Sequence, residues 1–425
     1  MNLFSNNNFR YMFFGRVVSN IGDSLYAVAA MWLVYDLGGS TFYTGLAGFL
    51  TVLPRIIQLL SGPLIDKISI RPLLINSQLI QCGLLLVIPL AYYFEFLTIA
   101  LVLTMSPVIM MFNMLVYPAQ MASLPDFVKN EDLTKANSYF TLAYQGIEVG
   151  CNAIAGVLIV IFGAVSIYLL DSALFLMGAL LFSMIKIEKK PANKQEYWMR
   201  NSIINQFKTY QLELREGMKI LISKRFSRLL FGMVVINLVG GATFVVLPSF
   251  SDYKGGAEIY GLLLMAQAFG SLSGALLTPY LNLEQFRMGK VYGVAFLLSG
   301  ILWAAAVVMP WKWLIIVVYG IAWVPGGVTN ILINTSLQKG VPKQLLGRVF
   351  SASFSLSGIA MPIGSLLGGS LGIIIGSFNV IFFSGITVFS VGLFWLADKT
   401  TSRLPAIKDI DEETFVNRTF KTHVN

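Results

Sequence analysis

The sequence predicts an all-α membrane protein of twelve transmembrane helices in two six-helix bundles, with both ends of the chain in the cytoplasm. Three observations support this expectation. The chain of 425 residues is 56% hydrophobic and only 12% charged, which is about half the charged content of soluble domains. Its apolar residues gather in long runs, and its basic residues gather in alternate connecting loops.

Twelve apolar stretches are long enough to cross a hydrocarbon core of about 30 Å, which requires about 20 helical residues. Lipid admits only helices and closed barrels, because every backbone polar group must be satisfied internally. Runs of this length favour helices. The expected spans are 10–36, 41–65, 72–94, 97–122, 133–162, 166–187, 227–251, 258–282, 288–309, 312–337, 345–375 and 378–397.

The basic residues predict the orientation of the chain. With the N-terminus inside, Lys254 and Lys312 fall in external loops and Arg16 and Arg55 fall within spans, so the other 26 of the 30 Lys and Arg are cytoplasmic. This distribution follows the positive-inside rule. It explains the net charge of +9 without nucleic acid as a partner, and we expect the chain in the cytoplasmic membrane of a bacterium.

The longest polar stretch divides the expected spans six and six. We expect an N-terminal bundle over 1–187, a cytoplasmic linker over 188–226, a C-terminal bundle over 227–398 and a mobile cytoplasmic tail over 399–425. The second part of the linker has the spacing of an amphipathic helix on the membrane surface, and a solvated linker is an equal alternative. Two halves of six spans indicate an internally duplicated transporter.

The stretch GPLIDKISIRP follows the second span and resembles the signature between helices 2 and 3 of major facilitator superfamily transporters. Gly62, Asp66, Lys67 and Arg71 match that signature, and the resemblance implies a gating latch between the two bundles. A glycine also permits close helix packing, and an acid at a helix end can cap a neighbouring helix or pair with bases. An ordinary charged turn is the alternative.

Three longer stretches resemble the branch of this superfamily that contains macrolide-efflux proteins and the enterobactin exporter. They are FRYMFFGRVVSNIGDSLYAVAAMWLVYDLGGS in the first span, YPAQMASLPDFVKNEDLTKANS before the fifth and TSLQKGVPKQLLGRVFSASFSLSGIAMPIGSLLGG around the eleventh. The resemblance implies the major facilitator fold and export of a drug, macrolide-like compound or siderophore, driven by proton entry. The alternatives are a flippase or uptake carrier of the same fold, or a membrane immunity or sensor protein that does not transport.

Ionisable residues within spans are candidates for function, because charges at membrane depth are costly. At 1.5 Å per residue, Asp23, Arg55 and Glu148 lie at a similar depth, about 16–22 Å from the inner face, on three different spans. Arg16 lies two turns below Asp23 on the same face. We expect Asp23 and Glu148 to be the proton-coupling acids, with Arg55 and Arg16 as ion-pair partners. A static Asp23–Arg55 pair joining two helices is the alternative.

Polar side chains on otherwise apolar helices are candidates for substrate contact. In the superfamily that the chain resembles, helices 1, 4, 7 and 10 line a central cavity, which points to Asn113 and Asn237. Asn330, Asn334 and Gln338 recur every four residues and therefore share one face of the tenth span. Hydrogen bonding between helices is the alternative role for these side chains.

Other chemically active residues are few. The one histidine, His423, lies near the C-terminus, and the two cysteines, Cys82 and Cys151, lie in apolar runs. We therefore expect no enzymatic activity, no cofactor and no metal site. Asp171, near the outer end of the sixth span, is expected to be an ordinary interfacial acid. The expected partners are protons, lipid and a small amphiphilic molecule, and the expected state is a monomer.

Overall fold

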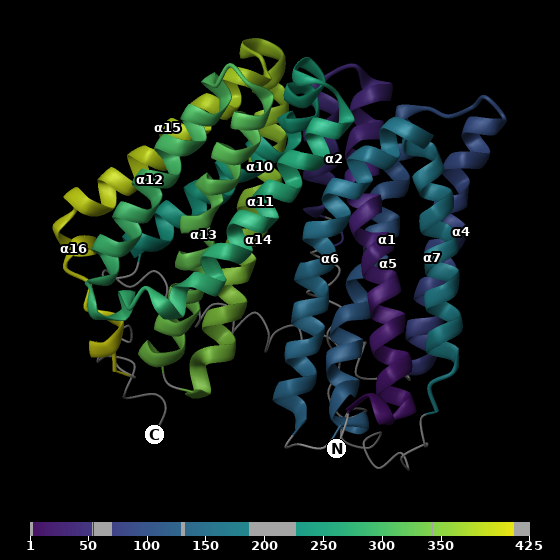
Figure 1. Cartoon of the computed structure of the whole chain (residues 1–425), viewed down its shortest axis with the longest axis horizontal. Helices are drawn as coiled ribbons and strands as arrows, with labels where there is room; N and C mark the ends of the chain where they lie inside the picture. The colour runs from purple at the N-terminus through teal and green to yellow at the C-terminus, as the bar shows by residue number, and fades with distance from the viewer. Residues whose placement is uncertain are drawn as a thin grey trace, which may run out of the picture. The chain divides into compact units, whose positions relative to one another are not determined.

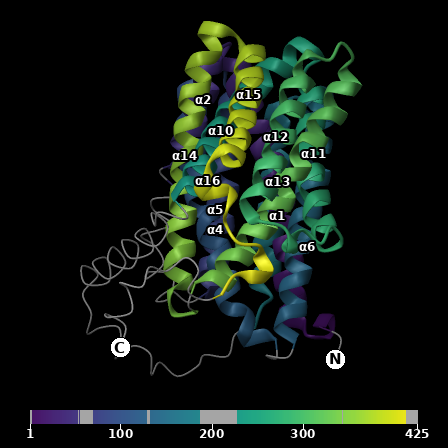
Figure 2. The ribbon, with the colours of Figure 1, turned by 90° about the vertical axis from the view of Figure 1, so that its left-hand side faces the viewer.

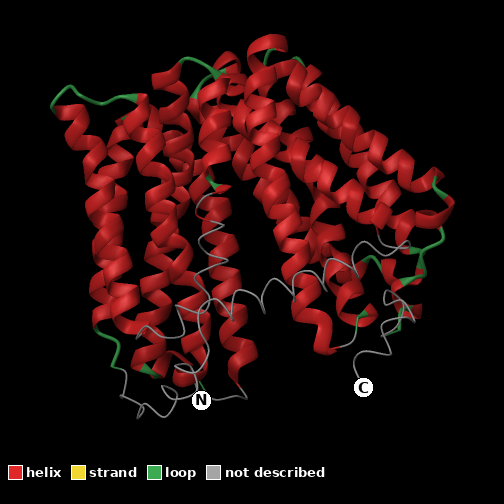
Figure 3. Cartoon of the chain, turned by 180° about the vertical axis from the view of Figure 1, so that it is seen from behind, coloured by secondary structure: helices red, strands yellow, loops and turns green. Residues whose placement is uncertain are grey.

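The computed structural model describes residues 3–52, 54, 70–128, 132–186, 227–341 and 343–411. In these residues the chain is helical, with short connecting loops (Figure 3). Nine segments of this described part are long and apolar enough to cross a membrane. The all-helical membrane architecture is therefore confirmed for the described residues, and the number of twelve spans stays a prediction.

The chain divides into two compact units. The first consists of Met1–Gln206 and Ser251–Met265, and the second of Phe207–Phe250 and Ala266–Asn425. The segment Ser251–Met265, which the sequence assigns to the C-terminal bundle, thus clusters with the first unit. The predicted linker helix lies outside the described residues.

The first unit is built around its first and its last long helix in the part of this half that the structure describes. Its helical elements are η1 (Leu3–Ser5), α1 (Asn7–Gly38), α2 (Thr41–Leu50), α4 (Ile70–Tyr93), α5 (Ile99–Phe127), α6 (Leu133–Phe162) and α7 (Ala164–Ser183) (Figure 1). α7 packs against both α1 and α4, and α1 also contacts α2, α5 and α6. The interior of this unit therefore lies where α1 and α7 meet.

Asparagine side chains at the start of α1 form hydrogen bonds to its own first turn, to α5 and to the residues after α7. The Asn6 side chain accepts hydrogen bonds from the backbone N–H groups of Asn8, at 2.9 Å, and Phe9, at 3.3 Å, and so caps the helix. Its amide donates to the carbonyl of Phe127 on α5 at 2.8 Å. Asn8 and the backbone of Lys186, after α7, exchange two hydrogen bonds of 2.8 and 2.9 Å. These bonds join α1, α5 and the end of α7.

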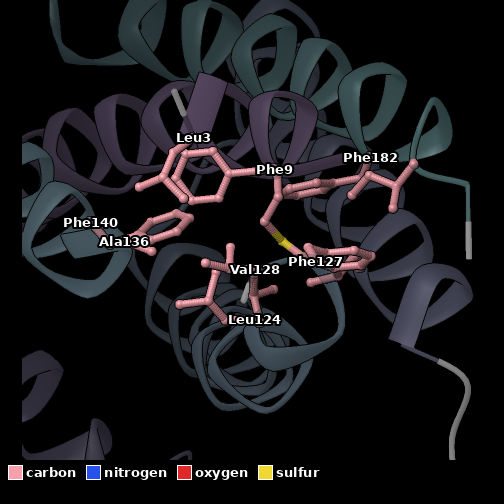
Figure 4. Packing of buried hydrophobic residues seen from close by; sticks show 12 residues of the cluster. Leu3, Phe9, Leu124, Phe127, Val128, Ala136, Phe140 and Phe182 are labelled. Carbon is pink, nitrogen blue, oxygen red and sulfur yellow. The ribbon is translucent and has the colours of Figure 1, made fainter. Parts of the chain in front are cut away.

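A cluster of aromatic and aliphatic side chains fills the core next to these bonds (Figure 4). Its members include Leu3, Phe9, Leu124, Phe127, Val128, Ala136, Phe140 and Phe182. The rings of Phe9 and Phe140 meet edge to face, with centroids 5.9 Å apart. Gly15 on α1 makes room for Phe182, because a Cβ atom there would lie 2.5 Å from the ring. Aromatic packing thus holds α1, α5, α6 and α7 together at this end.

The second half of the chain contains six longer helices and several short turns. They are α10 (Ser227–Lys254), α11 (Ala257–Leu277), η3 (Thr278–Tyr280), η4 (Leu283–Gln285), α12 (Met288–Val308), α13 (Lys312–Gly340), α14 (Lys343–Ile375), α15 (Ser377–Ala397), α16 (Lys399–Ser402) and η5 (Ile407–Asp409). α12 packs against α13 and, most extensively, against α15.

Glycines allow the helices of the second unit to approach closely. A Cβ atom at Gly300 of α12 would lie 2.2 Å from the backbone nitrogen of Phe389 on α15, and one at Gly364 of α14 would lie 1.8 Å from the carbonyl oxygen of Leu238 on α10. Small residues have this role in membranes, where close van der Waals packing drives helix association. The glycine positions therefore select which helix faces meet.

Among the described residues, each half contains the same one-residue link between two helices. Gly163 joins α6 to α7 with φ 79° and ψ 156°, and Gly376 joins α14 to α15 with φ 82° and ψ 153°. Only glycine adopts this backbone conformation at low energy. Two matching links between corresponding helices agree with a duplicated chain.

The segment after α15 is part of the second unit, where α16 packs against α12 and α15 (Figure 2). Asp398 caps α16 by accepting from the backbone N–H of Thr401 at 2.8 Å, and the backbone N–H of Met288 donates to the carbonyl of Pro405 at 3.1 Å. Leu404 and Ile407 are buried. The expected mobile tail is therefore wrong for 399–411, because apolar residues within it reach the core; residues 412–425 lie outside the described part.

Candidate functional site

The candidate site lies on α1, where an acid and a base face each other. Arg16 Nη1 lies 3.7 Å from Asp23 Oδ2, and the side chains are 7% and 21% exposed. Residues seven apart lie two turns apart on one helix face, so α1 by itself brings the two charges together. The base is buried, and the acid keeps some exposure.

A neighbouring helix provides a third group. The side-chain amide of Asn113 on α5 donates a hydrogen bond to Asp23 Oδ1, while Arg16 lies beside the other carboxylate oxygen. The sequence assigned Asn113 to substrate contact and did not connect it with the acid. Both residues lie near the middle of their helices, so the depth calculation, extended to neutral polar residues, contains a signal for this contact.

The three side chains form an arrangement suited to reversible protonation. The carboxylate has a cation on one oxygen and an amide donor on the other, both of which favour its charged form. Protonation of Asp23 would leave the buried guanidinium with a weaker partner, which is costly at membrane depth. A change in the proton occupancy of Asp23 would therefore alter the contacts of α1 with α5.

Glu148 occupies a different setting from Asp23. Its side chain on α6 is exposed, and among the described residues it makes no hydrogen bond or ion pair. Arg55, the expected partner of these acids, lies outside the described residues. The proposed pairing of Arg55 with Asp23 or Glu148 therefore stays a prediction.

The latch signature is described only at its end. Gly62, Asp66 and Lys67 lie outside the described residues. The guanidinium of Arg71, on the first turn of α4, donates to the carbonyl of Ser183 in the last turn of α7. A cation at a helix C-terminus stabilises the unpaired carbonyls there, so Arg71 joins two helices of the first unit.

The polar side chains predicted to contact substrate on α10 and α13 make local hydrogen bonds. The amide of Asn237 donates to the carbonyl of Met233 at 2.9 Å, one turn back on α10. The amide of Asn334 donates to Asn330 Oδ1 at 3.4 Å, and Asn330 and Gln338 are exposed on α13. The expected polar face of α13 is present, and its role in a cavity stays a prediction.

The position of the Asp171 side chain differs from the one expected from the sequence. The acid was assigned to the membrane interface, yet its side chain is 0% exposed within the first unit. That assignment is wrong because it rested on distance along the span, which does not show the direction of a side chain. Asp171 and Phe175 lie on the same face of α7, and this helical spacing is the signal that places the acid inward.

The chain matches one protein family over nearly its whole length and is similar to several named transporters. Residues 1–423 match the family described as transmembrane secretion effectors. The MFS-type transporter YvqJ of Bacillus subtilis is 23% identical, with 91% of each chain covered. The putative bacilysin exporter BacE of Bacillus amyloliquefaciens is 24% identical over 85% of this chain and 88% of that protein. The staphyloferrin A transporter of Staphylococcus aureus is 23% identical over 69% and 72%.

Solved structures show the same fold. The nucleoside transporter NupG superimposes with a TM-score of 0.64 at 13% identity, covering 93% of this chain and 99% of that one. A bacterial homologue of the human lysosomal transporter Spinster superimposes with a TM-score of 0.66 at 13% identity, covering 93% and 95%. At this identity the likeness concerns the fold alone.

Proposed function

The chain belongs to the transmembrane secretion effectors, a family of major facilitator transporters, and from that premise we propose that it exports a small amphiphilic molecule in exchange for protons. It is a multi-span transporter of the bacterial cell membrane. The proposal includes twelve spans, cytoplasmic termini, a monomer as the working unit and alternating access between two bundles.

The observation that carries the proton part of the proposal is the contact of Asp23 with Arg16 and Asn113. Charges within spans are rare and mark ion or proton pathways. Asp23 is 21% exposed and Arg16 is 7% exposed, so the acid is the more accessible of the two charges. In the proposed cycle, proton binding neutralises Asp23 and releases its contacts, and proton loss restores them.

The relatives support the substrate class. One is named as a putative exporter of bacilysin and another as a transporter of staphyloferrin A. We propose that the cargo is a small molecule with both polar and apolar parts. Asn237, Asn334 and the exposed Asn330 and Gln338 are the proposed polar contacts, because their amides can donate and accept hydrogen bonds.

The test uses everted membrane vesicles that contain the full chain, with ethidium, bacilysin and staphyloferrin A as probes. Respiration acidifies the lumen, so an exporter that exchanges protons accumulates its probe there, and a protonophore abolishes the accumulation. Asp23→Asn removes the titrating group and is expected to abolish uphill accumulation. Asp36→Asn, which changes an exposed acid on the same helix, is the matched control and is expected to transport normally.

Each contrary result has a distinct meaning. Accumulation that survives the protonophore would show that protons do not drive transport. Probe accumulation only in right-side-out vesicles would indicate an uptake carrier. Saturable binding without movement of any probe across the membrane would favour the sensor alternative. Normal transport by Asp23→Asn would remove Asp23 from the mechanism.

A further inference from the structure

Asp171 on α7 is a buried acid for which the proposed cycle has no role. Its side chain is 0% exposed, and within the described part of the chain neither carboxyl oxygen has a hydrogen-bond partner. Tyr168, one turn away, is 1% exposed, and its hydroxyl is likewise unpaired among the described residues. Buried polar groups in proteins are normally hydrogen-bonded, so these two side chains require an explanation.

The contacts on either side of Asp171 show where it lies. One turn toward the end of α7, the Phe175 ring covers Gly22 of α1, where a Cβ atom would lie 3.2 Å away. One turn toward the start of α7, the Tyr168 ring meets Tyr26 of α1 edge to face, with centroids 5.6 Å apart. Asp171 lies between these two layers on the same helix face, and therefore between α7 and α1.

The surroundings of Asp171 contain a second acid. Among the described residues, the titratable groups that neighbour Asp171 are Asp23 and Tyr26 of α1, Cys82 of α4 and Cys151 of α6, together with Tyr168 of α7. Asp23 lies on α1 between Gly22 and Tyr26, the residues that α7 contacts on either side of Asp171, and Arg16 lies beside Asp23. The neighbouring base is thus already engaged by the other acid.

These observations bear on the charge of Asp171. Burying an ionised carboxylate without hydrogen bonds or a counter-ion is far more costly than burying the neutral acid. A second negative charge at Asp23 adds repulsion, and two interacting carboxylates resist simultaneous ionisation. We propose that Asp171 holds a proton in this conformation and is, with Asp23, the second of two coupled proton-binding carboxyls in the first unit.

The inference rests on the proposed proton exchange and extends it. Asp23 is partly exposed and Asp171 is not, so the two carboxyls have different access to water. Asp23 exchanges protons with the solvent, and Asp171 retains its proton until the packing of α7 against α1 changes. Because the acids interact, the proton occupancy of one governs that of the other.

Infrared spectroscopy on the full chain in lipid nanodiscs tests the protonation of Asp171 directly, through the difference between the spectra of the wild type and of each variant. The C=O stretching band of a protonated carboxylic acid is expected in the wild-type protein at neutral pH. Asp171→Asn is expected to lose that band, and Asp36→Asn, the exposed control on α1, is expected to retain it. A band of unchanged intensity in folded Asp171→Asn, or no band in the wild type, would overturn the proposal.

A second variant decides the matter if Asp171→Asn does not fold. Asp171→Glu keeps a carboxyl at the site, so the band is expected to remain but to move in frequency. An unmoved band would assign the signal to another residue and overturn the proposal. A moved band would support it.

Transport assays separate this inference from the proposed function. In everted vesicles, Asp171→Asn is expected to lose uphill, proton-driven accumulation of a transported probe while retaining exchange of labelled for unlabelled probe without a gradient. A merely structural role would impair both activities. If the wild type shows no proton-driven accumulation, the proposed function fails, and the infrared band still reports whether Asp171 holds a proton. If accumulation is intact in Asp171→Asn, the coupling role of Asp171 alone fails.

Discussion

Asp23 and Asp398 show how the same side chain takes different roles. Asp23 lies within α1 and contacts a buried base and an amide of another helix. Asp398 follows α15 and accepts hydrogen bonds from the Arg228 guanidinium and from the backbone N–H and hydroxyl of Thr401. Burial alone would raise the pKa of Asp398, but hydrogen bonds from Thr401 and the charge and hydrogen bond of Arg228 outweigh it, so that its pKa is lowered. The first acid is suited to exchange protons, and the second stabilises a helix junction.

Replacing Asp398 tests this stabilising role. Asp398→Ala removes the cap of α16 and is expected to reduce the free energy of unfolding by about 1 kcal/mol. The ion pair adds little, because Arg228 is 44% exposed. A lower thermal midpoint in detergent than that of the wild type, measured at neutral pH, checks the prediction.

The same variant has an expected pH dependence. Because the folded-state pKa of Asp398 is below its ordinary value of 3.8, its contribution is fully present above that value and is lost as pH falls through the folded-state pKa. The difference in thermal midpoint between the wild type and Asp398→Ala should therefore shrink below pH 3.8. A difference that grows on acidification would contradict the assignment.

Glycines bring pairs of helices in the second unit into contact with each other's backbone. Gly300 of α12 packs on α15, and Gly364 of α14 packs on α10, each against backbone atoms. Backbone cannot move aside as a flexible side chain can. Gly240 of α10, by contrast, would have no atom within 4 Å of an added Cβ. Position in the helix pair therefore decides whether a glycine is required.

Two alanine substitutions distinguish these glycines. Gly300→Ala places a methyl group 2.2 Å from a backbone nitrogen, and the resulting strain is expected to destabilise the protein by about 1–3 kcal/mol. Gly240→Ala adds a methyl group in open space and is expected to be neutral or stabilising by up to about 1 kcal/mol, because alanine favours helix. Thermal unfolding in detergent measures both. Equal effects of the two substitutions would argue against the packing of α12 on α15.

At the scale of the whole molecule, orientation in the membrane follows from the distribution of charge. The basic residues gather in the segments expected on the cytoplasmic side, and each half of the chain contains the same glycine link. A duplicated chain with an even number of spans returns both ends to one side of the membrane. The proposed orientation therefore depends on span number as well as on charge.

Cysteine labelling tests this orientation. In a background of Cys82→Ser and Cys151→Ser, we expect Tyr253→Cys at the end of α10 to react with a membrane-impermeant maleimide in intact cells. Arg403→Cys, after α16, is expected to react only once the membrane is opened. Both positions are exposed, so accessibility of the side chain is matched. Labelling of Arg403→Cys in intact cells would reverse the proposed topology.

The sequence alone determined the membrane class and the helical fold, because long apolar runs act locally and are read directly from composition and spacing. It indicated the family through the resemblance of particular stretches to known transporters. It also placed Arg16 and Asp23 on one helix face, since helical periodicity links residues seven apart. Only the tertiary structure joined Asn113 to Asp23, turned Asp171 into the interior and packed 399–411 against other helices of the second unit. Those outcomes depend on which helices become neighbours. Depth and helical spacing can show that a residue faces inward, but they do not show which distant segment it will contact.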